Sequence, residues 1–147
     1  MNIKKYDIAV TIFDQNYIYK VGLQSILYDK YLNKIKVKFK HTDELYAKVI
    51  LTNIDVAFVH IPQKHSFECI QKYLLNFKKL NKKVKLIGYL DSYKFEVVEY
   101  AHVLCLDGIF LLSDTKEKIY SLLHQCTAHL RNNKPNKIDL IAKINNN

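Results

Sequence analysis

Five short apolar segments recur along this chain, and a stretch with helical periodicity follows each of them. The segments are rich in β-branched residues and cover 8–13, 35–40, 54–61, 84–90 and 108–112. Such runs are typical of buried strands. Strands that alternate with helices favour a parallel sheet with right-handed crossovers and helices on both faces. The sequence therefore predicts an α/β, flavodoxin-like (βα)5 fold with a five-stranded sheet of order 2-1-3-4-5.

Helix start signals precede most of the intervening stretches. Asp14 or Asn16 can cap the first helix, which we expect to run to about residue 31. Its predicted apolar face comprises Ile18, Gly22, Leu23, Ile26 and Leu27. The later helices are predicted from Thr42 to Asn53, from Ser66 to Leu80, from Ser92 to about Leu104, and from Asp114 or Thr115 to about Arg131.

The length of 147 residues fits one domain with a short tail. We expect the domain to cover 1–131 and residues 132–147 to form a polar, flexible tail rich in Asn and Lys. No apolar run is long enough to span a bilayer. The first apolar segment is broken by Asp14 and Gln15, so it is a poor signal peptide. A cytoplasmic location without membrane contact is the expectation.

Basic side chains outnumber acidic ones, with 23 Lys+Arg against 14 Asp+Glu. Such an excess can attract nucleic acid. Apart from Arg131, however, every one of these basic residues is a lysine, whereas bidentate recognition of phosphates and bases favours arginine. A solvated lysine surface is the main interpretation, and DNA binding through the lysines between 78 and 85 is the weaker alternative. The cysteines form no C-x-x-C pair, so we expect reduced thiols.

Four segments in this order resemble the CheY-like receiver domain of bacterial response regulators, most of all the receivers of LuxR/NarL-type helix-turn-helix regulators. The family's first strand and acidic turn are matched by IAVTIFDQN at 8–16, and its first helix by VGLQSIL at 21–27. Its third strand is matched by IDVAFVHIP at 54–62, and its fifth strand and helix by DGIFLLSDTKEKIYSLL at 107–123. The resemblance covers about residues 6–131 and implies the same sheet order.

The resemblance also implies a phosphorylation site, most of which this sequence has lost. Asp14 matches the first of the two acids that hold Mg²⁺ in the family, and Gln15 replaces the second. The other family positions are occupied by His60 for the phosphate-accepting aspartate, Leu90 (or Ser92 with a shift of two) for the sensing threonine, and Leu112 for the lysine. Mg²⁺ prefers several oxygen ligands, and phosphoryl transfer depends on positioning and charge compensation. We therefore expect a degenerate pseudo-receiver with no catalytic residue, no metal and no cofactor.

His60 remains open to other interpretations. The main one is a space-filling polar residue at the strand end with a pH-sensitive hydrogen bond. A phosphohistidine would need partner machinery of its own. A metal site formed by His60, His65 and Asp14 would not follow a known ligand spacing.

The expected function is a phosphorylation-independent, receiver-like signalling domain that acts by dimerisation or protein binding, in transcriptional or two-component regulation. The resemblance implies contacts through the fourth helix, fifth strand and fifth helix, where the candidate interface residues are Tyr93, Phe95, Tyr100, Ile109, Lys116, Tyr120 and His124. One alternative is the receiver part of a DNA-binding regulator whose output domain is missing. The other is a small enzyme on a doubly wound sheet, although none of the three glycines forms a phosphate-cradling loop after the first strand.

Overall fold

A five-stranded parallel sheet of order β2-β1-β3-β4-β5 forms the centre of the protein. The computed structural model describes residues 7–47 and 50–133. The strands are β1 (Ile8–Phe13), β2 (Ile35–Lys40), β3 (Val56–His60), β4 (Lys85–Leu90) and β5 (Gly108–Leu111). The predicted fold class and strand order are confirmed.

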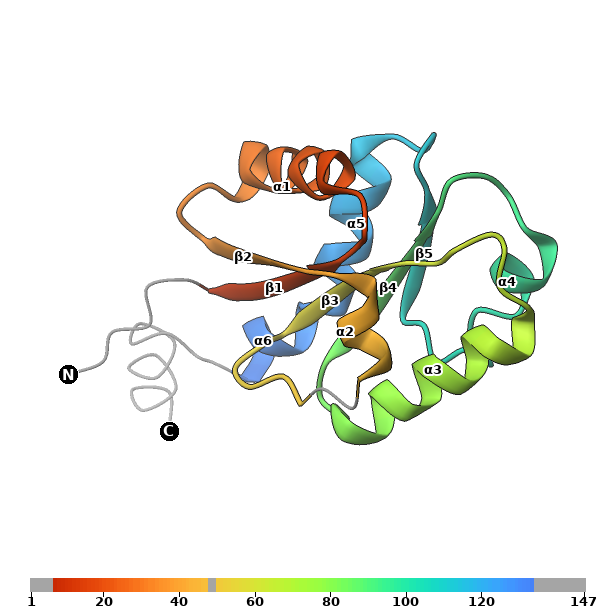
Figure 1. Ribbon diagram of the computed structural model, residues 1–147. Helices are drawn as coiled ribbons and strands as arrows, with labels where there is room; N and C mark the ends of the chain where they lie inside the picture. The colour runs from red at the N-terminus through yellow and green to blue at the C-terminus, as the bar shows by residue number, and fades with distance from the viewer. Residues whose placement is uncertain (1–6, 48–49, 134–147) are drawn as a thin grey trace.

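Helices cover both faces of this sheet. They are α1 (Tyr17–Tyr31), α2 (Thr42–Tyr46), α3 (Phe67–Leu80), α4 (Phe95–Glu99), α5 (Lys116–Cys126) and α6 (Ala128–Asn133). α1 and α5 lie on one face, and α2, α3 and α4 lie on the other (Figure 1). Within the part of the chain that the structure describes, no helix is long and apolar enough to cross a bilayer.

Two separate apolar cores result from the alternation of side chains along the strands. On one face, Phe58 of β3 packs in a cluster with Leu27 of α1 and Leu123 of α5. The next residue, Val59, belongs to the opposite cluster together with Leu74 of α3. Every residue of β3 is buried, so each of its two faces is covered by one of the two cores. The carboxyl end of β3 is therefore surrounded by protein on both faces.

The buried stripe of α1 differs from the predicted one. Lys20, Leu23 and Leu27 are the buried residues of this helix, and they follow an i, i+3, i+7 spacing. Ile18 is 77% exposed and Gly22 is also exposed. These two residues lie outside the stripe, so their assignment to the apolar face was wrong.

α4 is much shorter than the predicted helix from Ser92 to about residue 104. Its N-cap is Lys94 rather than Ser92, and the regular helix ends after five residues. Cys105 takes a positive φ of 61°, and the N–H of Leu106 donates to the carbonyl of Ala101 at 3.1 Å. This left-handed closure turns the chain towards β5. A non-glycine residue at that position gave no sequence signal for the turn.

Two further helices end earlier than predicted. α2 stops before Ala47, whose extended backbone ends the helix, instead of continuing to Asn53. α5 stops at Cys126, and the hydroxyl of the next residue, Thr127, donates to the carbonyl of Leu123 at 2.7 Å, a bond that often accompanies a bend. A separate helix, α6, then extends to Asn133. Residues 134–147 of the predicted tail lie outside the described residues.

Candidate functional site

Asp14 lies at the carboxyl end of β1, where the polar ends of three neighbouring strands meet. Its side chain is fully buried. One carboxylate oxygen, Oδ1, accepts the backbone N–H of Asn16 at 2.8 Å. The other, Oδ2, accepts the hydroxyl of Tyr89 at 2.8 Å. Both oxygens of this buried acid are thus satisfied within the protein, as a buried carboxylate requires.

The hydrogen bond from the N–H of Asn16 to Asp14 also shapes the start of α1. Asn16 is the N-cap residue, and its own Oδ1 accepts the N–H of Tyr19 at 3.3 Å. Asp14 therefore holds the turn between β1 and α1 and does not cap the helix itself.

His60 ends β3 and lies between two carboxylates. Its Nε2 donates to Oδ1 of Asp91 at 3.0 Å, and its Nδ1 is 3.8 Å from Oδ1 of Asp14. The residue is only 7% exposed. Its ring lies 5.3 Å from the ring of Tyr89 and 6.3 Å from that of Tyr19, measured between centroids. An imidazole thus occupies the space beside Asp14.

Tyr89 and Asp91 are residues of this site that the sequence analysis missed, and Tyr89 is the buried one. It is fully buried near the end of β4 and stacks on Phe110 of β5 at 5.3 Å. Burial raises the pKa of Tyr89 far above its usual range, and the charge of Asp14 and the hydrogen bond to it raise this pKa further. The hydroxyl therefore stays protonated and donates to the carboxylate. Tyr89 lies opposite His60 in the pairing of β3 with β4.

Of the five predicted site residues, Asp14 and His60 bring their polar side chains together, whereas Leu90 and Leu112 meet only through a backbone hydrogen bond of 2.9 Å. Asp14 and His60 are neighbours, as the resemblance implied. Gln15 is exposed, and Leu112 is 38% exposed. Leu90 is buried in the opposite core, on the face covered by α3 and α4.

Ser92, the alternative to Leu90, takes part in a contact between two loops. Its carbonyl and hydroxyl oxygens both accept the amide N–H groups of Gln63, at 2.6 and 3.0 Å. Nearby, the ammonium of Lys94 donates to the carbonyl of His65 at 2.7 Å. The loops after β3 and β4 are therefore held together by polar contacts next to the site.

The residues at this site do not fit a magnesium ion. Mg²⁺ takes several oxygen ligands in near-octahedral geometry, but both oxygens of Asp14 are already hydrogen bonded. Among the residues that the structure describes, no group of three or more His, Cys, Asp or Glu side chains could hold a metal ion. In particular, His65 does not join His60 and Asp14 as the metal alternative required.

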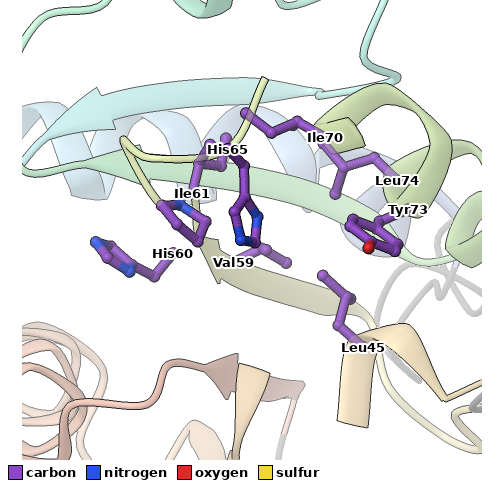
Figure 2. Close-up of a pocket in the computed structure, with 9 residues that line it drawn as sticks. Leu45, Val59, His60, Ile61, His65, Ile70, Tyr73 and Leu74 are labelled. Atoms are coloured by element: carbon purple, nitrogen blue, oxygen red, sulfur yellow. The ribbon is translucent and has the colours of Figure 1, made fainter. Parts of the chain in front are cut away.

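A small hollow lies on the far side of His60. Figure 2 shows the side chains of His65 and Tyr73 facing each other across it, while the ring of His60 lies to one side. The rings of His65 and Tyr73 are 6.4 Å apart between centroids. The remaining lining is mostly apolar and comes from α2, β3 and α3. The hollow is thus separate from the polar cluster around Asp14.

The predicted interface residues divide into exposed and buried ones. Those that are exposed are Tyr93, Phe95, Tyr100, Lys116 and His124, whereas Ile109 is partly buried against the α3–α4 core. Tyr120 is only 8% exposed, and its hydroxyl donates to the carbonyl of Ile26 at 2.8 Å. Its assignment to an interface was wrong because it joins α5 to α1.

Comparisons with known proteins agree with the fold. No protein-family model and no curated protein matches the chain. Among solved structures, the pilus assembly protein CpaE from Caulobacter crescentus aligns with a TM-score of 0.66 at 5% identity, over 80% of this chain and 92% of that one. A response regulator receiver domain protein from Clostridium thermocellum aligns with 0.65 at 11% identity, over 83% and 95%.

A third match is the complex of the P1 domain of CheA3 with CheY6 from R. sphaeroides. It aligns with a TM-score of 0.62 at 16% identity, over 84% of this chain and 98% of that one. Similarity at these identities is similarity of fold, which by itself does not determine function. The strand order, the helix layers and these matches together show that the chain has the receiver-domain fold.

Proposed function

We propose that this chain is a cytoplasmic, receiver-like signalling domain that is not switched by phosphorylation, is not an enzyme and acts by binding protein. One observation carries the first part of the proposal. Asp14, which the resemblance assigns to metal binding, is buried under the hydroxyl of Tyr89. His60, which the resemblance assigns to the position of the phosphate acceptor, lies with its Nδ1 3.8 Å from Oδ1 of Asp14. The site is filled by the protein's own side chains.

This arrangement lacks the elements on which phosphoryl transfer depends. Transfer to a receiver needs a carboxylate nucleophile and cations that neutralise the charge of the phosphoryl group. At the family's positions, this chain has an imidazole in place of the nucleophile and Leu112 in place of the cation. Opening Asp14 to a metal would also break its bond to Tyr89, which leaves a buried hydroxyl without an acceptor.

Exposed aromatic side chains support the protein-binding part of the proposal. Tyr93 is 54% exposed, Phe95 58% and Tyr100 47%. Aromatic residues are enriched at protein interfaces, and clusters of them on a surface mark interaction sites.

The lysine surface supports DNA binding less well. Lys78 donates to the carbonyl of Val84 and lies 3.5 Å from Oδ2 of Asp107. Lys85 lies 4.0 Å from Oδ1 of the same carboxylate. Two lysines of the 78–85 cluster are thus engaged with an acid of the protein itself.

Incubation with acetyl phosphate and Mg²⁺, followed by intact mass spectrometry, tests the proposal. We expect no adduct with the mass of a phosphoryl group on the wild-type protein. The Asp14→Asn and His60→Gln variants serve as matched controls for the two positions. Magnesium-dependent uptake by the wild type that disappears in either variant would refute phosphorylation independence.

A further inference from the structure

A hollow lies between the start of α3 and α4, two helices that lie next to each other (Figure 1), and the exposed Tyr100 is part of its lining. The hollow has a volume of about 440 Å³ and is lined by Ser66, Phe67, Glu68, Glu96, Tyr100 and Val103. We call these six residues together with Phe95 the α3–α4 patch. Its volume lies within the range of roughly 300–1,000 Å³ that is typical of ligand pockets.

Three aromatic rings give the patch a defined shape. Tyr100 lies between Phe67 and Phe95, with edge-to-face contacts at centroid distances of 6.4 and 6.2 Å. These contacts hold the rings in place while leaving 58% of Phe95 and 47% of Tyr100 exposed. A partner would therefore meet a preformed apolar surface and would have little side-chain order to impose on it.

The charge of the patch is opposite to that of the whole chain. Glu68 and Glu96 line the hollow, and both are exposed. Nearby, Glu99 accepts the hydroxyl of Tyr93 at 2.9 Å. The one cation at the start of α4, Lys94, donates to backbone carbonyls of Gln63 and His65. Two exposed carboxylates thus line an aromatic hollow on a protein whose formal net charge is +9.

The exposed aromatic rings and the acidic side chains of the patch together favour one kind of binding partner. In a symmetric dimer through this patch, Glu68 and Glu96 of one copy would face an identical acidic set on the other copy. Such like-charge contacts oppose association. A basic segment with apolar side chains would instead place its cations against the carboxylates and its apolar groups against Phe95 and Tyr100.

We propose that the α3–α4 patch is the docking site for a basic, amphipathic segment of a partner protein. The inference rests on the proposed protein-binding function and names its surface and the chemistry of its partner. The proposal places the contact between α3 and α4, so α5 takes no part in it.

Fluorescence anisotropy with labelled synthetic peptides tests the proposal on the full chain. The probe is a helical peptide of leucine and lysine only, with leucines at i, i+3, i+4 and i+7. The comparison peptide has glutamate in place of each lysine. We expect the lysine peptide to bind, with an affinity that falls as salt rises, and the glutamate peptide to bind far more weakly.

Variants of the protein locate the binding site. We expect Phe95→Ser, and separately the pair Glu68→Lys and Glu96→Lys, to raise the Kd of the lysine peptide about tenfold, which corresponds to about 1.4 kcal/mol. Tyr17→Ser removes an aromatic ring of similar exposure on α1, 67%, and should leave the Kd unchanged. All of these positions are exposed, so we expect the variants to fold.

Three outcomes would overturn the proposal. They are equal binding of the two peptides, an unchanged Kd in the charge-reversal variant, and a dimer in sedimentation experiments that Phe95→Ser dissociates. The phosphoryl-uptake experiment concerns Asp14 and His60 and uses none of the variants of the α3–α4 patch. Its failure can therefore be distinguished from failure of the docking proposal.

Discussion

Replacing Tyr89 by phenylalanine would test whether the site is closed. The change removes the hydroxyl that donates to Oδ2 of Asp14 at 2.8 Å. It keeps the ring that stacks on Phe110, so the packing between β4 and β5 should survive. What is lost is one hydrogen bond to a fully buried carboxylate.

The expected cost follows from what remains around Asp14. A hydrogen bond to a charged group contributes about 1.5–3 kcal/mol, and a buried acceptor without its donor carries a desolvation penalty. Asp14 keeps the N–H of Asn16 and a near contact with His60. We therefore expect Tyr89→Phe to lower the free energy of unfolding by about 2 kcal/mol. For a chain of this size, that corresponds to a Tm lower by about 4–8 °C.

Tyr120→Phe is a matched control. Tyr120 is also buried, but its hydroxyl donates to the neutral carbonyl of Ile26 at 2.8 Å. Hydrogen bonds between neutral groups contribute about 0.5–1.5 kcal/mol. Urea unfolding at neutral pH, followed by circular dichroism, measures both variants, and the m-value should not change. If Tyr89→Phe cost no more than Tyr120→Phe, then Asp14 would be hydrated or uncharged in the folded protein, and the site would not be closed.

Two further predictions concern stability. Since burial raises the pKa of Tyr89 above its unfolded value, the unfolded chain releases this proton first as pH rises. The stability that this group contributes is then fully present below about pH 10 and falls by about 1.4 kcal/mol per pH unit above it. Urea unfolding between about pH 9 and 11 measures this, and the free energy of unfolding should fall less steeply with pH in Tyr89→Phe than in the wild type. Gly88→Ala would place its Cβ 2.8 Å from Cδ1 of Ile61 and should lower the free energy of unfolding by about 1–3 kcal/mol. The Cβ of Gly22→Ala meets no atom within 4 Å, so this change should stabilise α1 by about 0.5–1 kcal/mol. A stable Gly88→Ala protein, or a destabilised Gly22→Ala one, would contradict this account of the packing.

The sequence predicted the sheet well because its signal is local. β1 and β2 begin and end at the predicted residues, since each is an apolar or alternating run bounded by polar turn residues. The turn between α4 and β5 could not be predicted in this way. It closes with Cys105 in a left-handed backbone, a conformation that favours glycine and leaves no mark when another residue takes it.

The candidate site could be predicted only in part, because its contacts are remote in sequence. Asp14 and Tyr89 are 75 residues apart, and His60 and Asp91 are 31 apart. No periodicity links such pairs. The one available signal was topological: residues at the carboxyl ends of adjacent parallel strands share one edge of the sheet. Tyr89 lies near the end of β4, the strand next to His60, and Asp91 directly follows that strand, so this rule would have placed both at the site.

The short length of α4 explains why the binding surface lies where it does. A helix of five residues buries little of itself, and Val97 is the only residue of α4 that is fully buried. The aromatic residues at its ends, Phe95 and Tyr100, therefore stay exposed. α5 is twice as long and buries four residues, Tyr120 among them. The short α4 thus leaves Phe95 and Tyr100 to form the apolar part of the α3–α4 patch, and the acids beside them limit which partners can bind there.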